Sequence, residues 1–389
     1  MYFQVLDNKK ECYAIYCDNE LYYYPNGLEL SKTWSWSCHA PVAPDVAEIW
    51  SGGLSLKQAC PEDLRDDLDR IQNKGMAFLK AFNTSKIMLD DVCFYDLVPK
   101  KYLMEYCEVK NKISKYVFEH YKKPANYDFQ VDLARLLNKI SSREIAVSSD
   151  RISGLTIPER NKFQQARSLK KINYNQWGSK TGRLTTKQNS FPILTLPKSL
   201  RSMLVPNNDL FVELDYNSAE ARVVLALSGR PQPEIDIHEH VRQEVYNNRY
   251  TRDETKQKVF AWLYNPKAKN KKLSSYIDKE SLLQKYYLDG VINTPFNRQM
   301  VVDETKALNY LIQSTASDMF LRQAIKIDQM LGDRKSSIAF CVHDSLVLDV
   351  SKEDKDLLQN IMETFKSTDL GEFMTNTMIG KNYGAMRSL

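Results

Sequence analysis

The sequence lacks the features that mark zinc-binding, disulfide-rich and membrane-spanning proteins. Its seven cysteines include no pair at C-x-x-C spacing, so neither a zinc site nor a disulfide framework is predicted. No apolar run approaches the ~20 residues that a membrane-spanning helix needs, and no secretory leader is visible. Internal repeats and low-complexity tracts are also missing. We therefore expect a globular protein with reduced thiols, located in the cytoplasm and without a membrane partner.

The composition is that of an ordinary globular protein with a slight excess of positive charge. The 389 residues are 43% hydrophobic and 26% charged, with a net charge of +5. This length predicts two or three lobes. Short strands are expected around a turn at residues 18–20, and an apolar stripe predicts one long helix at about residues 103–121. Basic residues gather at 110–123, at 160–171 and in a loop at 265–272.

One segment joins a hydrophobic strand, a carboxylate and a helix. It reads Leu210-Phe211-Val212-Glu213-Leu214-Asp215-Tyr216-Asn217-Ser218-Ala219-Glu220-Ala221-Arg222. The apolar run ends on Asp215, and Glu220 opens a second apolar stretch of helical character with Arg222 at +2. This pattern predicts a strand-to-helix corner with an exposed carboxylate, a common arrangement for holding a divalent metal. For Asp215 taken alone, a solvated turn residue is the simpler interpretation, and the metal site is favoured only when the other segments are considered with it.

A second carboxylate occupies a predicted β-hairpin near the C-terminus. Residues 338–342 and 346–350 are expected to form two short strands around His343 and Asp344. If this hairpin and the strand of Asp215 are neighbours in one sheet, both carboxylates can bind Mg²⁺, which prefers oxygen ligands. Two Mg²⁺ ions roughly 3.5–4 Å apart serve phosphoryl transfer, one activating the attacking hydroxyl and one holding the leaving pyrophosphate.

A helical segment at about residues 238–264 carries a ladder of four residues spaced by four: Arg252, Lys256, Phe260 and Tyr264. A step of four turns a helix through roughly 400°, so the ladder lies on one face and spans roughly 18 Å. The cations come first, at the positive end of the helix macrodipole, where anions bind favourably. The ladder therefore fits a nucleoside triphosphate, with phosphates on the cations and sugar and base on the aromatics. The alternative is an amphipathic helix whose aromatics belong to the core.

Taken in order, these segments resemble the motifs of the family A DNA polymerases, the Klenow-type enzymes of bacteria and many bacteriophages. Residues 215–222 resemble motif A, the four-residue ladder resembles motif B, and residues 342–344 resemble motif C. Residues 181–184 resemble an upstream arginine motif, and residues 309–316 resemble the palm helix. The resemblance covers about residues 170–389. It implies an α+β right-hand polymerase fold with an antiparallel palm sheet, helical fingers and a helical thumb.

The resemblance also implies a division of the chain into lobes. We expect a small β-rich segment at 1–55, the thumb at 56–165, palm at 166–230, fingers at 231–290 with the motif B helix at 251–264, and palm again at 291–389. A 3′–5′ exonuclease domain of this family is several times longer than residues 1–55. Asp18-Asn19-Glu20 matches the D-x-E pattern of such a domain, but no partner acids accompany it. We therefore expect a compact, bacteriophage-like, exonuclease-deficient form in a bacterial or virus-infected host cytoplasm.

Residue roles follow from the resemblance. Asp215 and Asp344, with the backbone carbonyl of Tyr216, would bind two Mg²⁺ ions, and Mn²⁺ would substitute. Glu220 would exclude a ribose 2′-hydroxyl, although a helix-N-terminal acid is also favoured by the dipole. Lys256 would act as the general acid for the leaving pyrophosphate. The remaining nucleotide-binding residues would be Arg252, Phe260, Tyr264 and His238.

The expected ligands are primer-template DNA and dNTPs. The residues that would contact DNA are Arg183, Arg222, Asn309, Gln313 and His343. Minor-groove acceptors are shared by all base pairs, so contacts there test pair geometry rather than sequence. We expect a monomer, with a processivity factor, a helicase or a separate exonuclease as candidate protein partners.

Some positions depart from the family pattern, and two other functions remain open. Ala261 and Asn265 stand where motif B usually has glycine, Ser314 replaces a common glycine, and Ser345 stands where an acid usually follows motif C. A single-subunit RNA polymerase would share both aspartates but would not be expected to keep Glu220. An inactive clamp on primer-template DNA would not need the two aspartates.

Overall fold

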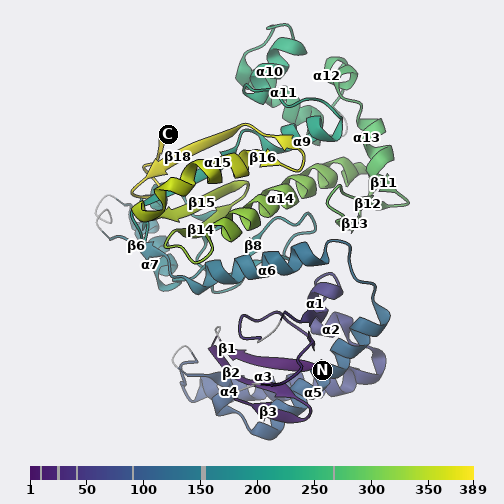
Figure 1. The fold of residues 1–389 in the computed structure, drawn as a ribbon, viewed down its shortest axis with the longest axis vertical. Helices are drawn as coiled ribbons and strands as arrows, with labels where there is room; N and C mark the ends of the chain where they lie inside the picture. The colour runs from purple at the N-terminus through teal and green to yellow at the C-terminus, as the bar shows by residue number, and fades with distance from the viewer. Residues whose placement is uncertain (9–10, 24–26, 41–42, 90–91, 150–154, 266–267) are drawn as a thin grey trace. The chain divides into compact units, whose positions relative to one another are not determined.

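The computed structural model describes residues 1–389 except 9–10, 24–26, 41–42, 90–91, 150–154 and 266–267 (Figure 1). Its contacts divide the chain into two compact units, Met1–Arg135 and Leu136–Leu389. The boundary falls inside helix α6 (Tyr127–Ser142), so the predicted thumb at residues 56–165 extends across it. Within the described part of the chain, no helix is both long and apolar enough to cross a membrane.

A three-stranded antiparallel sheet opens the first unit. Its strands are β1 (Phe3–Asn8), β2 (Glu11–Cys17) and β3 (Glu20–Tyr22). Asp18 and Asn19 form the turn between β2 and β3, and both have positive φ angles. Asparagine and aspartate tolerate this conformation better than most residues. The predicted strands around this turn are therefore confirmed.

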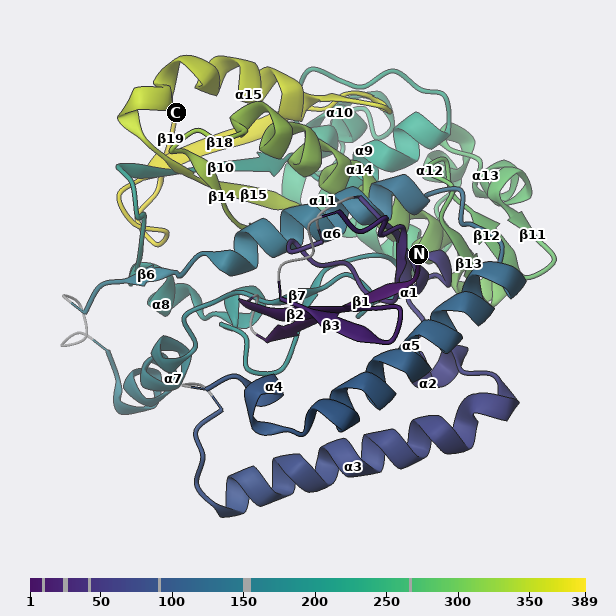
Figure 2. The ribbon, with the colours of Figure 1, turned by 60° about the horizontal axis from the view of Figure 1, so that its bottom comes forward.

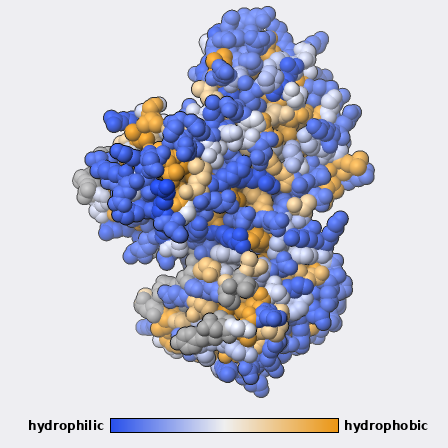
Figure 3. Space-filling view, viewed as in Figure 1, coloured by the Kyte–Doolittle hydropathy of each residue, from blue (hydrophilic) through white to orange (hydrophobic). Residues whose placement is uncertain are grey.

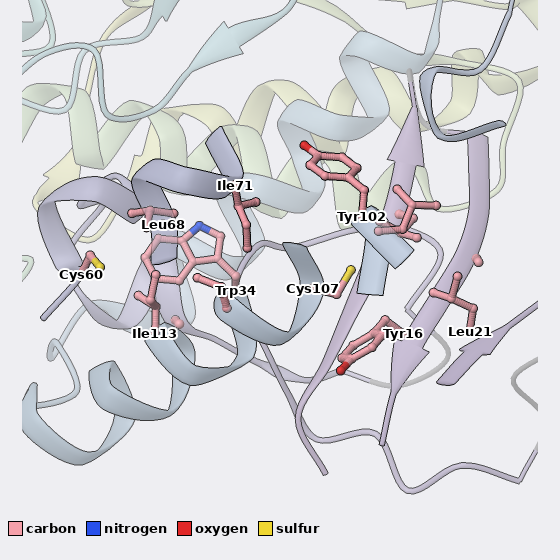
Figure 4. Close-up of a cluster of buried hydrophobic side chains, with 14 of the residues drawn as sticks. Tyr16, Leu21, Trp34, Cys60, Leu68, Ile71, Tyr102, Cys107 and Ile113 are labelled. Atoms are coloured by element: carbon pink, nitrogen blue, oxygen red, sulfur yellow. The ribbon is translucent and has the colours of Figure 1, made fainter. Parts of the chain in front are cut away.

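Two long helices contribute to the first unit's core, α3 (Arg65–Thr84) and α5 (Lys100–His120). The predicted apolar stripe is confirmed on α5, where its buried residues include Leu103, Val109, Ile113 and Val117. Figure 4 shows how such side chains meet the sheet, with Tyr16, Trp34, Leu68, Ile71, Tyr102 and Cys107 in one cluster. All seven cysteines are free thiols. Shorter elements of this unit are β4 (Lys32–Thr33), β5 (Asp45–Val46), α1 (Ala47–Trp50), α2 (Leu56–Ala59) and α4 (Phe94–Leu97).

A five-stranded antiparallel sheet forms the centre of the second unit, in the order β14-β15-β10-β18-β19. Its strands are β10 (Leu210–Tyr216), β14 (Ser337–Val342), β15 (Ser345–Val350), β18 (Thr375–Gly380) and β19 (Arg387–Ser388). The central strand β10 pairs with β15, placing Asp215 opposite Ser345. The predicted hairpin at residues 338–350 and its place beside the strand of Asp215 are both confirmed.

Helices α14 (Glu304–Leu331) and α15 (Leu358–Lys366) pack on one face of this sheet (Figures 1 and 2). The Tyr216 ring stacks on Phe365 of α15 at 4.3 Å, and its hydroxyl donates to the Phe365 carbonyl at 2.6 Å. Phe320 of α14 meets Phe365 edge-on at 6.3 Å. Because side chains alternate along a strand, Asp215 and Glu213 project from the face opposite Tyr216.

A group of helices follows β10 in the chain: α9 (Ala219–Leu227), α10 (Ile237–Glu244), α11 (Arg252–Tyr264), α12 (Lys271–Tyr276) and α13 (Lys279–Tyr286). The continuous helical segment predicted at about residues 238–264 is wrong. Asn247 and Asn248 adopt positive φ angles and end the first helix, and Thr251 begins the second with a capping box to Glu254. The structure therefore presents two short helices where one was expected.

Short strand pairs and helices complete the second unit. They are β6 (Ala146–Val147), α7 (Ile157–Ser168), β7 (Tyr174–Asn175), β8 (Thr185–Thr186), α8 (Lys198–Arg201), β9 (Leu204–Val205), β11 (Tyr287–Leu288), β12 (Val291–Asn293), β13 (Gln299–Val301), β16 (Ser367–Thr368) and β17 (Gly371–Glu372). On the face drawn in Figure 3, hydrophilic side chains cover most of the surface. The class of the fold is α+β, as predicted.

Candidate functional site

Asp215 and Asp344 come together at one edge of the five-stranded sheet. Asp344 is adjacent in sequence to Ser345, the cross-strand partner of Asp215. Burial, together with the negative charges of Asp344 and Glu213, raises the pKa of Asp215 to about 7. Burial also raises the pKa of Asp344, against the lowering effect of a backbone hydrogen bond and of His343 and Arg183. The two carboxylates therefore repel one another in a partly desolvated corner.

This corner fits a divalent metal ion. A cation between the two carboxylates would offset the repulsion that raises the pKa of Asp215. Among the residues that the structure describes, no three His, Cys, Asp or Glu side chains are grouped so that they could hold a metal. Mg²⁺ needs no such group, because it usually takes one or two carboxylates and completes its shell with water and substrate phosphates. The backbone carbonyl of Tyr216, next to Asp215, is a further oxygen at this corner.

We expect Asp215→Asn to stabilise the metal-free protein at alkaline pH. Because the folded-state pKa of Asp215 is raised to about 7, its contribution to stability is full below its unfolded-state pKa and is lost as pH rises through 7. Asparagine carries no charge, so the gain should appear at pH 8 and vanish near pH 4. Each kcal/mol of relief would raise Tm by roughly 2–4 °C. Thermal unfolding in EDTA at both pH values measures this, and equal Tm values at pH 8 would contradict it.

Glu220 lies in the first turn of α9 and is paired with Arg183 from the loop before β8. Burial raises the pKa of Glu220, and the Arg183 guanidinium opposes this rise. The Arg183 side chain is 48% exposed and that of Glu220 is 17% exposed, so the pair faces solvent on the arginine side. Ser218 at the start of α9 has a φ of +55° and makes no side-chain cap. The structure thus joins the predicted sugar gate to a predicted DNA contact.

Arg222 corrects one prediction. Its side chain is fully buried, and its guanidinium donates to the carbonyls of Asn217 at 2.9 Å, Pro233 at 3.0 Å and Ile235 at 2.8 Å. Burial lowers the pKa of Arg222 to about 10. A guanidinium enclosed by backbone carbonyls presents no donor to DNA. Arg222 therefore stabilises the connection between α9 and α10 and is not the DNA contact that was predicted.

Asp236, at the N-cap of α10, is a residue that the sequence reasoning missed. Its carboxylate accepts hydrogen bonds from the backbone N–H groups of His238 and Glu239 and from Asn217 Nδ2 at 2.9 Å. Arg252 adds Nη2 at 2.6 Å and Nε at 3.1 Å. Burial raises the pKa of the Asp236 carboxyl, but hydrogen bonds from Arg252 and Asn217 outweigh this effect and hold the pKa well below its usual range. Aspartate at a helix start was the available signal.

His238 is fully buried beneath the ladder helix. Its Nε2 lies 3.0 Å from Ser218 Oγ, and its ring centroid lies 5.8 Å from that of Phe260. Burial lowers the pKa of His238 to about 4, so the imidazole is neutral at pH 7. Its Nδ1 has no hydrogen-bond partner among the described residues. A phosphate contact by His238 would therefore be a hydrogen bond and not an ion pair.

The four-residue ladder occupies one partly exposed face of α11. The buried residues of this helix form a separate stripe: Thr255, Val259, Trp262 and Leu263. Arg252 and Lys256 are exposed, whereas Phe260 and Tyr264 are half-buried and stack with ring centroids 5.8 Å apart. Lys256 Nζ lies 5.9 Å from the centre of the Phe260 ring. The aromatics are thus not core residues, which contradicts the alternative interpretation of this helix.

Asn309 and Gln313 lie one turn apart and half-buried on α14. Asn309 Oδ1 and Tyr264 Oη are buried atoms without a hydrogen-bond partner among the described residues. Buried polar atoms are normally paired, so such atoms mark places where water or a ligand binds. His343 is exposed in the hairpin turn, with a φ of +57°. These positions are consistent with the predicted contacts, which remain predictions.

Residues 279–384 match the sequence profile of DNA polymerase family A. This stretch includes α14 and the β14–β15 hairpin, and therefore Asn309, Gln313 and Asp344. This part of the chain is therefore similar to DNA polymerase family A. The motif A segment at residues 215–222 precedes the matched residues.

Two further similarities are found. The chain is 24% identical over 243 residues to DNA polymerase I of Caldicellulosiruptor bescii, across 48% of this chain and 28% of that protein. The solved POL domain of Pol1 from M. smegmatis, in complex with DNA primer-template and dNTP, aligns with a TM-score of 0.48 and 18% identity. That alignment covers 85% of this chain and 66% of the other. The chain therefore spans less than two thirds of the length of either relative.

Proposed function

We propose that the chain is a DNA-directed DNA polymerase that extends a primer 3′-hydroxyl with dNTPs by two-metal phosphoryl transfer. The pairing of β10 with β15 carries this proposal, because it brings Asp215 and Asp344 together in a chain whose residues 279–384 match the DNA polymerase family A profile. Both aspartates face a corner with a concentration of negative charge, which a catalytic metal site requires. The exposed cations of α11 supply positive charge for a triphosphate.

The residues divide the reaction between them. Bound at Asp215, Asp344 and the Tyr216 carbonyl, Mg²⁺ would lower the pKa of the primer 3′-hydroxyl and offset phosphate charge. The 3′-oxygen forms a bond to the α-phosphorus while the bond to the leaving pyrophosphate breaks. Lys256 donates a proton to the leaving pyrophosphate. The Arg252 guanidinium binds the pyrophosphate and offsets its negative charge.

The substrate contacts follow from the same arrangement. Phe260 packs on the deoxyribose, Tyr264 borders the insertion site, and His238 offers a neutral hydrogen bond to phosphate. Arg183, Asn309, Gln313 and His343 contact the primer-template. Arg252 is held by Asp236 in this structure, so a triphosphate must compete with that carboxylate for the guanidinium.

The proposal extends to the lobes of a right hand. The five-stranded sheet serves as the palm, residues 231–290 as the fingers and residues 56–165 as the thumb. We further propose a compact, phage-like monomer that does not proofread. Asp18 and Asn19 are accounted for by the turn between β2 and β3. Excision of a 3′ mismatch by this chain, lost when Asp18 and Glu20 are replaced, would contradict the last point.

Glu220→Ala should admit ribonucleotides more readily than the wild type. Alanine removes the carboxylate that would meet a 2′-hydroxyl, so we expect the dNTP/rNTP ratio of kcat/KM to fall by about 10–10²-fold. Steady-state incorporation of dCTP and CTP opposite a template guanine measures this ratio. Because Arg183 loses its partner as well, Arg183→Ala is the matched control and should leave the ratio near that of the wild type. An unchanged ratio in Glu220→Ala would remove the gate role.

One experiment separates this proposal from its two alternatives. A primed template is incubated with the wild-type chain, Mg²⁺ and either four dNTPs or four rNTPs. A DNA polymerase extends the primer with dNTPs, whereas an RNA polymerase-like enzyme uses rNTPs. An inactive clamp binds the primer-template and extends it with neither. The Arg183–Glu220 pair favours the first outcome, because it holds a carboxylate beside the metal corner.

A further inference from the structure

The loop that carries Arg183 lies directly against a buried guanidinium. Gly182 has a φ of +76°, and a Cβ added to it would lie 2.4 Å from Nη2 and 2.6 Å from Cζ of Arg298. Such an approach leaves space only for the hydrogen of glycine, which also tolerates this φ without strain. Gly182 is buried, whereas Arg183 next to it is exposed. The position of the loop backbone at Gly182 is therefore limited by the Arg298 guanidinium beneath it.

Arg298 is fixed by an ion pair with Asp318 of α14. Its Nε and Nη2 donate to the two carboxylate oxygens at 2.9 and 2.6 Å, and the two side chains are 10% and 0% exposed. Arg298 lies in the turn between β12 and β13. Its own N–H donates to Thr294 Oγ1 at 3.1 Å, and the Thr294 N–H donates to the Arg298 carbonyl at 3.0 Å. Bidentate pairing fixes the direction of the guanidinium as well as its distance.

Hydrogen bonds among residues 179–182 make the loop that carries Arg183 compact. The Gly182 N–H donates to the Ser179 carbonyl at 3.1 Å, and the Ser179 and Thr181 hydroxyls lie 2.9 Å apart. The Thr181 N–H donates to Ser179 Oγ at 3.3 Å. These contacts join the loop to itself. The contact of Gly182 with Arg298, in addition to the Arg183–Glu220 pair, positions the loop against the β12–β13 turn and, through Asp318, against α14.

We propose that Arg298 and Asp318 are positioning residues for Arg183, an inference that rests on the proposed polymerase function. Helix α14 carries Asn309 and Gln313 and, through Asp318 and Arg298, also supports the loop of Arg183. One helix thus sets the spacing of all three proposed minor-groove contacts. The pair thereby determines how strictly a mismatched primer end is rejected. A lysine ammonium cannot reproduce the planar, two-donor support of a guanidinium.

Arg298→Lys tests this role, because lysine keeps the positive charge but lacks the planar guanidinium group. The first measurement is amide hydrogen exchange of a peptide that contains residues 179–183, which we expect to become faster by at least about tenfold as the support loosens. The second is the ratio of matched to mismatched primer extension, which we expect to fall by about 10–10²-fold, since displacements near 1 Å have effects of that size. Arg334→Lys makes the same change at the Arg334–Asp354 pair and should alter neither.

A double-mutant cycle shows whether Arg298 acts through Arg183. If it does, the variant with both Arg183→Ala and Arg298→Lys should discriminate against mismatches no worse than Arg183→Ala alone. Additive losses would overturn the proposal, and so would unchanged exchange of the loop in Arg298→Lys. If the wild type extends no primer, the polymerase proposal fails, while the exchange measurement still decides whether Arg298 supports the loop.

Gly182→Ala tests the same contact from the other side. The added methyl group clashes with the Arg298 guanidinium but leaves both side chains of the ion pair present, so this variant serves if Arg298→Lys does not fold. We expect the same faster exchange at residues 179–183 and the same loss of mismatch discrimination. Wild-type behaviour of Gly182→Ala in both measurements would overturn the proposal.

Discussion

Asp344→Asn should lower kcat for nucleotide addition by at least about 10²–10³-fold, the loss typical when one group that stabilises transition-state charge is removed. Asparagine keeps the shape of the side chain but cannot neutralise a metal ion. Primer-template affinity should stay close to that of the wild type, because Asp344 contributes negative charge and therefore no attraction to DNA. Single-turnover extension together with a DNA-binding titration separates the two effects.

Asp209→Asn is the matched control for this experiment. Asp209 precedes β10 at the end opposite Asp215 and pairs with Lys352 at 3.3 Å. The same chemical change there should leave kcat near the wild-type value. Wild-type kcat in Asp344→Asn, with the control also unchanged, would mean that the hairpin carboxylate does not belong to the reacting centre.

Lys256→Ala should lower kcat by about 10²–10⁴-fold, the usual contribution of a general acid, and should also raise KM for dNTPs. The ammonium is exposed on the ladder face of α11, where it can reach a bound triphosphate. Lys256→Arg keeps the charge but is a much weaker acid, because a guanidinium does not lose its proton in this pH range. We therefore expect Lys256→Arg to recover KM while kcat stays low.

Lys258→Ala is the control for Lys256. Its ammonium lies 4.3 Å from the centre of the Tyr250 ring, so it is engaged elsewhere on the same helix. Pre-steady-state incorporation at several dNTP concentrations gives kcat and KM for each variant. Equal effects of the two alanine substitutions would show that general positive charge, and not Lys256 itself, is responsible.

The sequence predicted the carboxylate corner well because its determinants are local. Strand β10 and the β14–β15 hairpin each follow from short apolar runs bounded by polar turns, and Asp215 and Asp344 lie at the ends of those runs. The ladder on α11 follows from helix periodicity alone. What such patterns cannot supply is the identity of the neighbours, and the pairing of β10 with β15 required the structure.

The predictions that failed depend on contacts between distant residues. Arg222 was expected to contact DNA because it lies in the segment that resembles motif A, yet carbonyls of the 233–235 segment enclose it. The break between α10 and α11 uses exposed, left-handed Asn247 and Asn248, a turn that the helical pattern did not single out. Two further contacts join residues far apart in the sequence, so no local pattern predicts them. They are the ion pair of Asp236 with Arg252 and the contact of Gly182 with Arg298.

Templated DNA synthesis at the corner of Asp215 and Asp344 can be tested directly by single-nucleotide addition. The wild-type chain is incubated with Mg²⁺ on four primed templates that differ only in the first unpaired base. Each dNTP is offered separately, and EDTA replaces Mg²⁺ in parallel reactions. We expect each template to accept its complementary dNTP and EDTA to abolish addition. Tight binding of the primer-template without any addition, or addition that ignores the template base, would contradict this expectation.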